Sequence, residues 1–356
     1  MFRITHLIPV IAVAAMAVSA APANTKTMKM TIVSAAPPIV TYVRVAKTKF
    51  IPEVDKRLAA SGKDFKIEWV QAYSQSLAKF HEVFETVEEN VAQVGLILKN
   101  FEASKVAIEQ FTYVTPFVGH NAEQMITIDR NMRKAIPELN TIYGKYDQVF
   151  LHSGTSPSMH LFTTFPVKRF EDLKGHKIGA SGSMGLWLRN TGAVTVSSSM
   201  LNSFTDIKNG LYDGYPISEI LAFPYKTYEV AKHLTRTRFG VSATSAITVN
   251  TDTWNDMPKH ARDIFRDVAQ DYGHWQKAID LSKIAKFTGI MKKKGVKVAD
   301  LSAVERTRWA KVLPNLAKDW AERLEKRGLP GRKVIKTFMD QARALNVPIA
   351  RHWDRD

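Results

Sequence analysis

The sequence predicts two doubly wound α/β domains, joined by a hinge with crossing strands and braced by C-terminal helices. Two observations carry this prediction. Short apolar segments alternate with segments of helical periodicity over roughly the first 250 residues, which is typical of strands linked by crossover helices. After residue 251 the pattern is helical. The 356 residues, 45% of them hydrophobic, supply enough apolar surface for two cores.

The N-terminal segment 1–23 has the pattern of a secretory signal peptide. Arg3 precedes an apolar run over 7–18, and small residues follow as far as Ala23. The run is shorter than the roughly 20 residues that a membrane-spanning helix needs. A short membrane anchor is the alternative. We expect cleavage near Ala20 to Ala23 and a mature protein in the periplasm.

The first α/β domain is predicted over 24–150. Its elements alternate as strand 29–33, helix 40–60, strand 65–70, helix 77–90 and strand 91–96. Strands separated by helices form a parallel sheet, and such sheets bind ligands beyond the carboxyl ends of their strands. The loops that begin at Ser34, Tyr73 and Leu96 should therefore face one cleft.

The second domain is predicted over 151–250, with strand 148–153 at the crossing and 246–250 as the returning strand. Within it, 170–214 has the pattern strand, turn, helix, strand, loop and helix. The small residues of 179–185 permit a tight turn before the helix, whose first N–H groups would be free to bind an anion.

The last segment, 251–356, is predicted to form helices that brace both domains. An apolar stripe from Ala261 to Trp275 repeats at helical spacing and is interpreted as core rather than a cofactor site. Further amphipathic helices are expected over 301–326 and 333–345.

Composition narrows the chemistry. Fifty Lys and Arg against 34 Asp and Glu give a net charge of +16, which would suit nucleic acid, an acidic surface or an anionic ligand. Export argues against nucleic acid, and a solvated basic face is the simpler interpretation. The absence of Cys excludes disulfides, thiolate metal sites and Cys nucleophiles. No His pair has metal-ligand spacing, so neither a metal nor a cofactor is expected.

Five short segments together resemble the DctP-type solute receptors of TRAP transporters. They are DLKGHKI at 172–178, GAV at 192–194, DIKNGLYDG at 206–214, KTYEV at 226–230 and WNDMP at 254–258. The resemblance implies a type II periplasmic-binding-protein-like fold without enzymatic activity. It also implies a monomer that captures a small organic molecule (an organic acid, sulfonate or aromatic compound) and delivers it to the membrane subunits of a TRAP transporter.

The chain departs from the family at the positions that hold a ligand carboxylate. The family's clamp Arg after K-I falls on Gly179, an Asn falls on Ile217, and a second Arg falls near Ser158 and Met159. Either backbone donors of 181–184 hold the anion with a cation from elsewhere, or the ligand carries no simple carboxylate. The candidate cations are His160, Arg189 and Arg44, each of which is alternatively a surface or core residue.

The predicted ligand-binding residues share positions on segments expected to face the cleft. They are Tyr73, Gln75, Leu96, His160, Gly179, Ser181, Trp187, Met200, Tyr215 and Ile217. Trp187 can equally belong to the core.

Two other classes of function remain open. A periplasmic hydrolase could use Ser153, Ser181 or Ser183 with His152 or His160, although no G-x-S-x-G elbow is present. A ligand sensor or scaffold without a transport role could bind a polyanion through a basic face.

Overall fold

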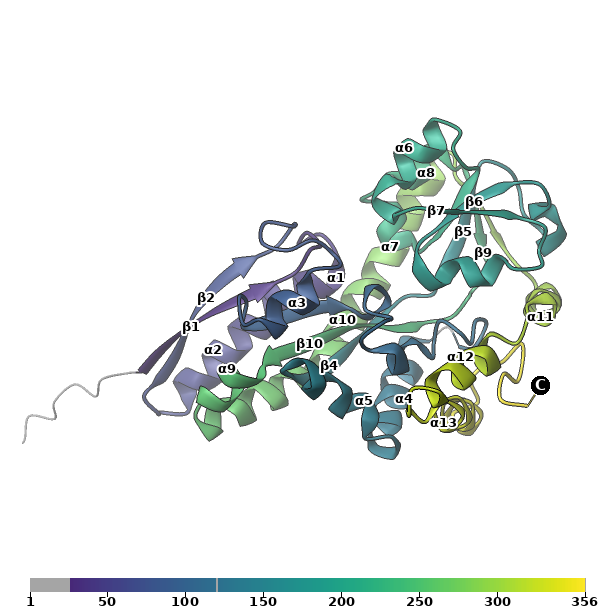
Figure 1. Ribbon diagram of the computed structural model, residues 1–356. Coiled ribbons are helices and arrows are strands. Elements are labelled where there is room, and N and C mark those ends of the chain that lie inside the picture. The colour runs from purple at the N-terminus through teal and green to yellow at the C-terminus, as the bar shows by residue number, and fades with distance from the viewer. Residues whose placement is uncertain (1–25, 120, 356) are drawn as a thin grey trace, which may run out of the picture.

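The structure is a computed structural model that describes residues 26–119 and 121–355. The expected signal peptide and its cleavage site lie outside these residues. Two α/β lobes lie at the two ends of the molecule, and a long helix, α10, runs between them (Figure 1). Lobe I is built on a five-stranded sheet and lobe II on a six-stranded sheet. The predicted α/β class with two lobes is confirmed.

The sheet of lobe I has the strand order β2-β1-β3-β10-β4. Its strands are β1 (Lys26–Val33), β2 (Phe65–Ala72), β3 (Val94–Leu98), β4 (Gln148–Ser156) and β10 (Ser242–Asn250). β1 is parallel to β2 and β3, which confirms the arrangement predicted for the first three strands. β10 is antiparallel to β3 and β4, so the complete sheet is mixed. The domain boundaries themselves stay a prediction.

The helices of lobe I only partly follow the predicted ranges. They are α1 (Thr41–Val45), α2 (Ile51–Ala60), α3 (Val83–Glu88), α4 (Ala122–Ala135) and α5 (Glu138–Thr141). A π-helical turn, Ala46–Phe50, joins α1 to α2, so the predicted helix 40–60 is nearly continuous. The helix predicted from residue 77 begins only at Val83. Ser74 and Gln75 have φ near +60°, which is turn geometry, and the chain continues as turns before α3.

The sheet of lobe II has the strand order β11-β9-β5-β8-β6-β7. Its strands are β5 (His160–Thr163), β6 (Lys177–Ala180), β7 (Val194–Ser197), β8 (Gly214–Ile217), β9 (His233–Arg236) and β11 (Lys297–Asp300). The sequence did not predict β8, β9 or β11. β8 contains Pro216, which reads as a strand breaker, yet Pro216 pairs with Leu161 of β5. The short helices α6 (Ser203–Lys208), α7 (Glu219–Ala222) and α8 (Thr227–Val230) complete this lobe.

Helix α10 (Lys259–Lys293) follows the short helix α9 (Thr251–Asp256) and contacts both lobes. It packs on α1, α2 and β4 of lobe I and on α7 of lobe II. The apolar stripe predicted from Ala261 is buried at Ala261, Phe265, Val268 and Tyr272, which confirms its role in the core. Within the described residues, no helix is long and apolar enough to cross a membrane.

The last three helices are α11 (Ala303–Val312), α12 (Leu316–Glu325) and α13 (Gly331–Ala344). The helix predicted over 301–326 is split between α11 and α12, because Pro314 cannot continue it. α13 packs on α4 of lobe I, whereas α11 contacts the 3-10 helix Phe170–Leu173 of lobe II.

Candidate functional site

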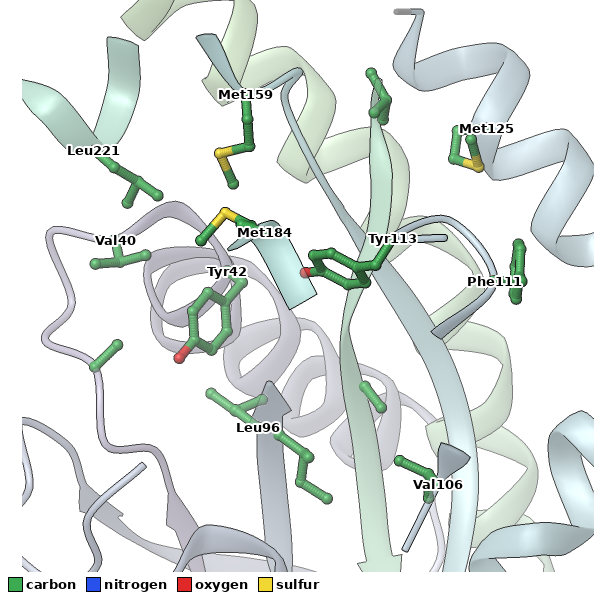
Figure 2. Close-up of a cluster of buried hydrophobic side chains, with 14 of the residues drawn as sticks. Val40, Tyr42, Leu96, Val106, Phe111, Tyr113, Met125, Met159, Met184 and Leu221 are labelled. Carbon is green, nitrogen blue, oxygen red and sulfur yellow. The ribbon is translucent and has the colours of Figure 1, made fainter. Parts of the chain in front are cut away.

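A cleft between the lobes holds about 680 Å³ of space between protein atoms, including its open mouth. Both lobes, the hinge segments and α10 supply its walls. The lining residues are Ala36, Val40, Thr41, Tyr42, Phe80, Leu98, Asn100, Tyr113, Thr155, Ser156, Pro157, Met159, Met184, Met200, Ile220, Leu221, Tyr225, Thr244, Ser245 and Gln276. In Figure 2, Met159, Met184 and Leu221 gather near the rings of Tyr42 and Tyr113. A mainly apolar lining with a few polar groups is typical of a site for a small organic molecule.

The aromatic walls are fixed from behind. Tyr42 stands in the first turn of α1, with its Oη 3.1 Å from Ser34 Oγ, and its carbonyl accepts a hydrogen bond from the Tyr272 hydroxyl. Burial raises the pKa of both Tyr42 and Tyr113, and it raises the pKa of Tyr225 to about 12. All three phenols are therefore neutral at physiological pH.

Trp187 supports the cleft wall without lining it. Its ring is stacked on Tyr113 with centroids 6.2 Å apart, and its Nε1 donates to the Tyr113 carbonyl at 2.8 Å. The ring is buried, with 1% exposed. The position of Trp187 thus fits the core interpretation. Its contact with Tyr113 joins lobe II to a residue that lines the cleft.

Several polar groups face the cleft without a partner in the described protein. The side chains of Asn100, Thr155, Ser245 and Tyr225 make no hydrogen bond there. Gln276, on α10, donates from Nε2 to the Thr155 carbonyl, and its buried Oε1 has no partner. Hydroxyl and amide groups both donate and accept, so they suit neutral hydrogen-bonding groups on a ligand.

None of the described residues that line the cleft is charged. Two charged side chains of α10, Lys283 and Asp280, interact with Thr41 of the lining. Lys283 Nζ donates to Thr41 Oγ1 at 3.1 Å and to the Ile39 carbonyl at 2.7 Å. Burial raises the pKa of Asp280 to about 7 and lowers the pKa of Lys283, so burial disfavours the charged form of each side chain.

Met200 is the one residue of the predicted ligand-binding set that lines this cleft. Tyr73, Leu96, Tyr215 and Ile217 are buried, and Tyr215 Oη donates to the Ser198 carbonyl at 3.0 Å. Gln75 is exposed in its turn. Ser181 is buried and directly precedes the short 3-10 helix Gly182–Leu188 that carries Met184.

Gly179 faces a ring rather than a ligand. A Cβ added there would lie 2.6 Å from the ring of Tyr212. Tyr212 is buried, and its Oη lies 3.2 Å from Ser198 Oγ. The position to which the sequence resemblance assigns the family's clamp Arg is thus closed by a tyrosine, and no side chain fits there without displacing that ring.

The candidate cations lie outside the cleft. Arg44 and Arg189 are exposed. His160 is buried in a separate hollow, the hinge groove, whose lining includes Glu219, Arg236 and Arg238. Its Nδ1 accepts from the Arg238 backbone N–H at 3.2 Å, and its Nε2 lies 3.6 Å from Glu219 Oε2. Burial lowers the pKa of His160, which favours the neutral ring.

The residues proposed for a hydrolase form no triad. Ser153 Oγ accepts hydrogen bonds from Lys99 at 3.0 Å and Arg133 at 2.7 Å, so it is engaged by two cations. Burial lowers the pKa of His152 to about 4, and among the described residues no candidate serine is hydrogen-bonded to a histidine. Nor do the described residues contain a group of three His, Asp or Glu side chains placed to hold a metal ion.

Sequence reasoning missed most of the lining, including Tyr42, Tyr113 and Gln276. It placed the loop after the third strand at Leu96, but β3 continues to Leu98, and Leu98 and Asn100 are the residues that reach the cleft. The cleft therefore lies at the carboxyl end of β3, two residues further along the chain than the sequence predicted. No periodicity marks Gln276 on α10.

Comparison with known proteins agrees with this architecture. The sequence matches the family described as bacterial extracellular solute-binding protein, family 7 (DctP), over residues 57–324. A solute-binding protein of Albidiferax ferrireducens is 27% identical over 164 residues, which is 45% of this chain and 48% of that protein. The match thus spans about half the length of that relative.

Solved structures resemble the fold over most of its length. A TRAP solute-binding protein from Rhodoferax ferrireducens in complex with benzoate has a TM-score of 0.78 at 14% identity, covering 90% of this chain and 98% of that one. A TRAP protein from Desulfovibrio salexigens has a TM-score of 0.77 at 18% identity, covering 88% and 95%. A Bordetella pertussis receptor that binds pyroglutamic acid has a TM-score of 0.75 at 21% identity, covering 88% and 100%.

The family match covers well over half of the chain, and its strands, helices and interlobe cleft are those of a two-lobed binding protein. The chain belongs to family 7 of the bacterial extracellular solute-binding proteins, the DctP family.

Proposed function

We propose that this protein is a periplasmic receptor that captures one small organic ligand in the cleft and delivers it to the membrane subunits of a TRAP transporter. The observation that carries the proposal is that a single cleft takes its lining from both lobes, the hinge and α10. A ligand that touches both lobes stabilises their closed arrangement, which is how a two-lobed receptor signals occupancy to a partner.

The similar proteins of known structure support binding of small organic molecules. Their ligands are benzoate in the Rhodoferax protein, pyroglutamic acid in the Bordetella protein and D-glucuronate in a Pseudomonas putida protein. These ligands share modest size and differ in ring chemistry, so the ligand of this chain must be argued from its own cleft.

The receptor is proposed to convert nothing. The candidate serines and histidines are not paired, and Ser153 is held by Lys99 and Arg133. A binding protein requires only shape and hydrogen bonding.

Native mass spectrometry of the protein purified from its own periplasm tests the binding step. One bound small molecule per chain, released unchanged on denaturation, is expected. Calorimetry with that compound should give a stoichiometry near one. A reaction product after overnight incubation, or protein that neither carries nor binds any small molecule, would contradict the proposal.

Uptake by cells tests the delivery step. Deletion of the receptor should abolish accumulation of the radiolabelled ligand, and complementation with the intact chain should restore it. Uptake that persists without the receptor would remove the transport role while leaving binding intact. Sequencing of the mature N-terminus should begin between Ala21 and Asn24, and an intact Met1 on periplasmic protein would refute export by signal-peptide cleavage.

A further inference from the structure

In the part of the chain that the structure describes, the cleft lining carries no charge that could neutralise an ionised ligand. None of its described lining residues is Lys, Arg, His, Asp or Glu. Lys283 contacts the lining, but its Nζ donates hydrogen bonds to Thr41 and to the Ile39 carbonyl. It also interacts electrostatically with Asp280. A carboxylate that entered this cleft would lose its hydration without gaining a partner charge.

The cations outside the cleft do not supply this charge. Arg44 and Arg189 are exposed to solvent. His160 lies in the hinge groove, where it binds the Arg238 backbone N–H and faces Glu219. At Gly179, the position that the resemblance assigns to the family's clamp Arg, the Tyr212 ring leaves no space for a side chain.

We propose that the cleft selects an uncharged, mainly apolar aromatic molecule that carries a small neutral hydrogen-bonding group. This inference rests on the proposed function, because it takes the cleft as the ligand site. It names the ligand class from the lining alone.

The walls fit a flat ring. Tyr42, Tyr113, Tyr225 and Phe80 contribute aromatic surfaces, and Met159, Met184 and Met200 contribute thioethers. Thioether sulfur and aromatic edges both make favourable contacts with a ring, and Met side chains adapt to its outline.

The unpartnered polar groups define where the neutral group binds. Asn100 offers an amide, and Thr155 and Ser245 offer hydroxyls. These groups can donate to a carbonyl or accept from a hydroxyl or amide N–H, and a site built to make such hydrogen bonds disfavours an analogue that lacks them. A phenol, an aromatic aldehyde or an aromatic amide meets both requirements.

Matched pairs of acid and amide test the inference directly. Benzoate and benzamide have the same ring and nearly the same shape but differ by one charge, and pyroglutamate and its primary amide form a second pair without an aromatic ring. Calorimetry with the ligand-free protein should show that benzamide binds at least ~100-fold more tightly than benzoate, because only the anion is desolvated without compensation. Phenol is the third probe. Its binding should be equal at low and high salt.

A charge placed in the lining should reverse the preference. Met200 is only partly buried and lines the cleft, so Met200→Lys adds a cation with little disturbance of the core. It should favour benzoate over benzamide, whereas Met200→Leu, the uncharged control, should keep the wild-type order. Thermal melts of both variants establish that they are folded.

The outcomes separate this inference from the proposed function. Binding of benzoate or pyroglutamate at or above the affinity of the amide, with one ligand per chain, would overturn the inference and leave the receptor function standing. Failure of every neutral aromatic probe, when the protein from its own periplasm still carries a charged molecule, would do the same. Absence of any bound or bindable small molecule would overturn both.

Discussion

The interlobe cleft and a buried charge cluster of lobe I meet at one short segment of chain and have opposite chemistry. Leu98 and Asn100 line the uncharged cleft, whereas the Lys99 side chain between them is fully buried in a charge cluster formed with Glu109, Asp129, Arg133 and Ser153. Lys99 Nζ lies 2.9 Å from Glu109 Oε2, and Arg133 Nη2 lies 2.7 Å from Glu109 Oε1.

This protein tolerates buried charge where it supplies the opposite charge itself. In the charge cluster every charge meets an opposite charge that the protein itself supplies, so desolvation is compensated. In the cleft the partner would have to come from the ligand.

Removing the shared anion should break the charge cluster. Glu109→Gln leaves Lys99 and Arg133 buried beside each other with only Asp129 as a full counter-charge. We expect the free energy of unfolding to fall by about 3–5 kcal/mol, measured by urea denaturation. Glu53→Gln, which breaks solvent-exposed pairs with Arg57 and Lys56, is the control and should lower stability far less. Equal effects would mean that the cluster is structurally unimportant.

Replacing Gly179 of lobe II by arginine should destabilise the protein, because no space exists for the side chain. In Gly179→Arg the new Cβ would lie 2.6 Å from the Tyr212 ring, so the ring or the strand must move. We expect a loss of about 3 kcal/mol in unfolding free energy. Gly289→Ala, where nothing lies within 4 Å of the added Cβ, is the control and should not destabilise. A stable Gly179→Arg variant that binds benzoate tightly would show that Tyr212 yields to a clamp.

Asp280, beside the cleft lining, makes the stability of the folded protein depend on pH. An unfolded Asp loses its proton near pH 4, whereas burial raises the pKa of Asp280 to about 7 in the folded protein. Between these values the folded state holds a proton that the unfolded state lacks, so this group makes stability fall as pH rises from about 4 to about 7.

Asp280→Asn should remove this slope. Relative to the wild type it should gain on the order of 1–2 kcal/mol at pH 8, because the lost attraction to Lys283 offsets part of the relief from desolvation. The advantage should vanish near pH 4. The exposed Asp267→Asn on the same helix is the control for chemical denaturation across this pH range. An Asp280→Asn variant that loses stability at pH 8 would contradict the sign.

The exposed arginines should matter least. Arg44→Ala and Arg189→Ala lie outside the cleft lining, so ligand affinity should stay within about twofold of the wild type by calorimetry. A loss of affinity confined to acidic ligands would show that one of them swings into the cleft, and would weaken the contrast between the two regions.

The sequence predicted the parts of the fold that local patterns encode. Alternation of apolar runs with helical periodicity predicted β1 to β3, and the stripe from Ala261 to Tyr272 predicted the buried face of α10. It did not predict β11, which returns to lobe II after α10, because the pairing of β11 with β9 depends on residues more than 60 positions apart.

The site was harder to predict than the fold. Met200, on a segment that the family motifs frame, lines the cleft as expected, and its role in ligand binding stays a prediction. Tyr42 and Gln276 lie on helices whose approach to the cleft depends on how α10 packs across both lobes. Tyr215 and Ile217 were expected at the site, yet β8 turns them into the interior of lobe II. The face of a sheet on which a side chain lies cannot be known until the pairing of its strand is known.

The contact between Trp187 and Tyr113 gives the protein an optical sensor of its own. Trp187 is stacked on a ring that lines the cleft, and its carbonyl accepts a hydrogen bond from the indole of Trp309 on α11. Phe239 fills the angle between the two indoles, 4.9 Å from Trp187 and 5.3 Å from Trp309 by ring centroids. Indole fluorescence depends on its immediate surroundings. A ligand that moves Tyr113 should therefore change the emission without any label, and stopped-flow mixing would follow capture and lobe closure in real time.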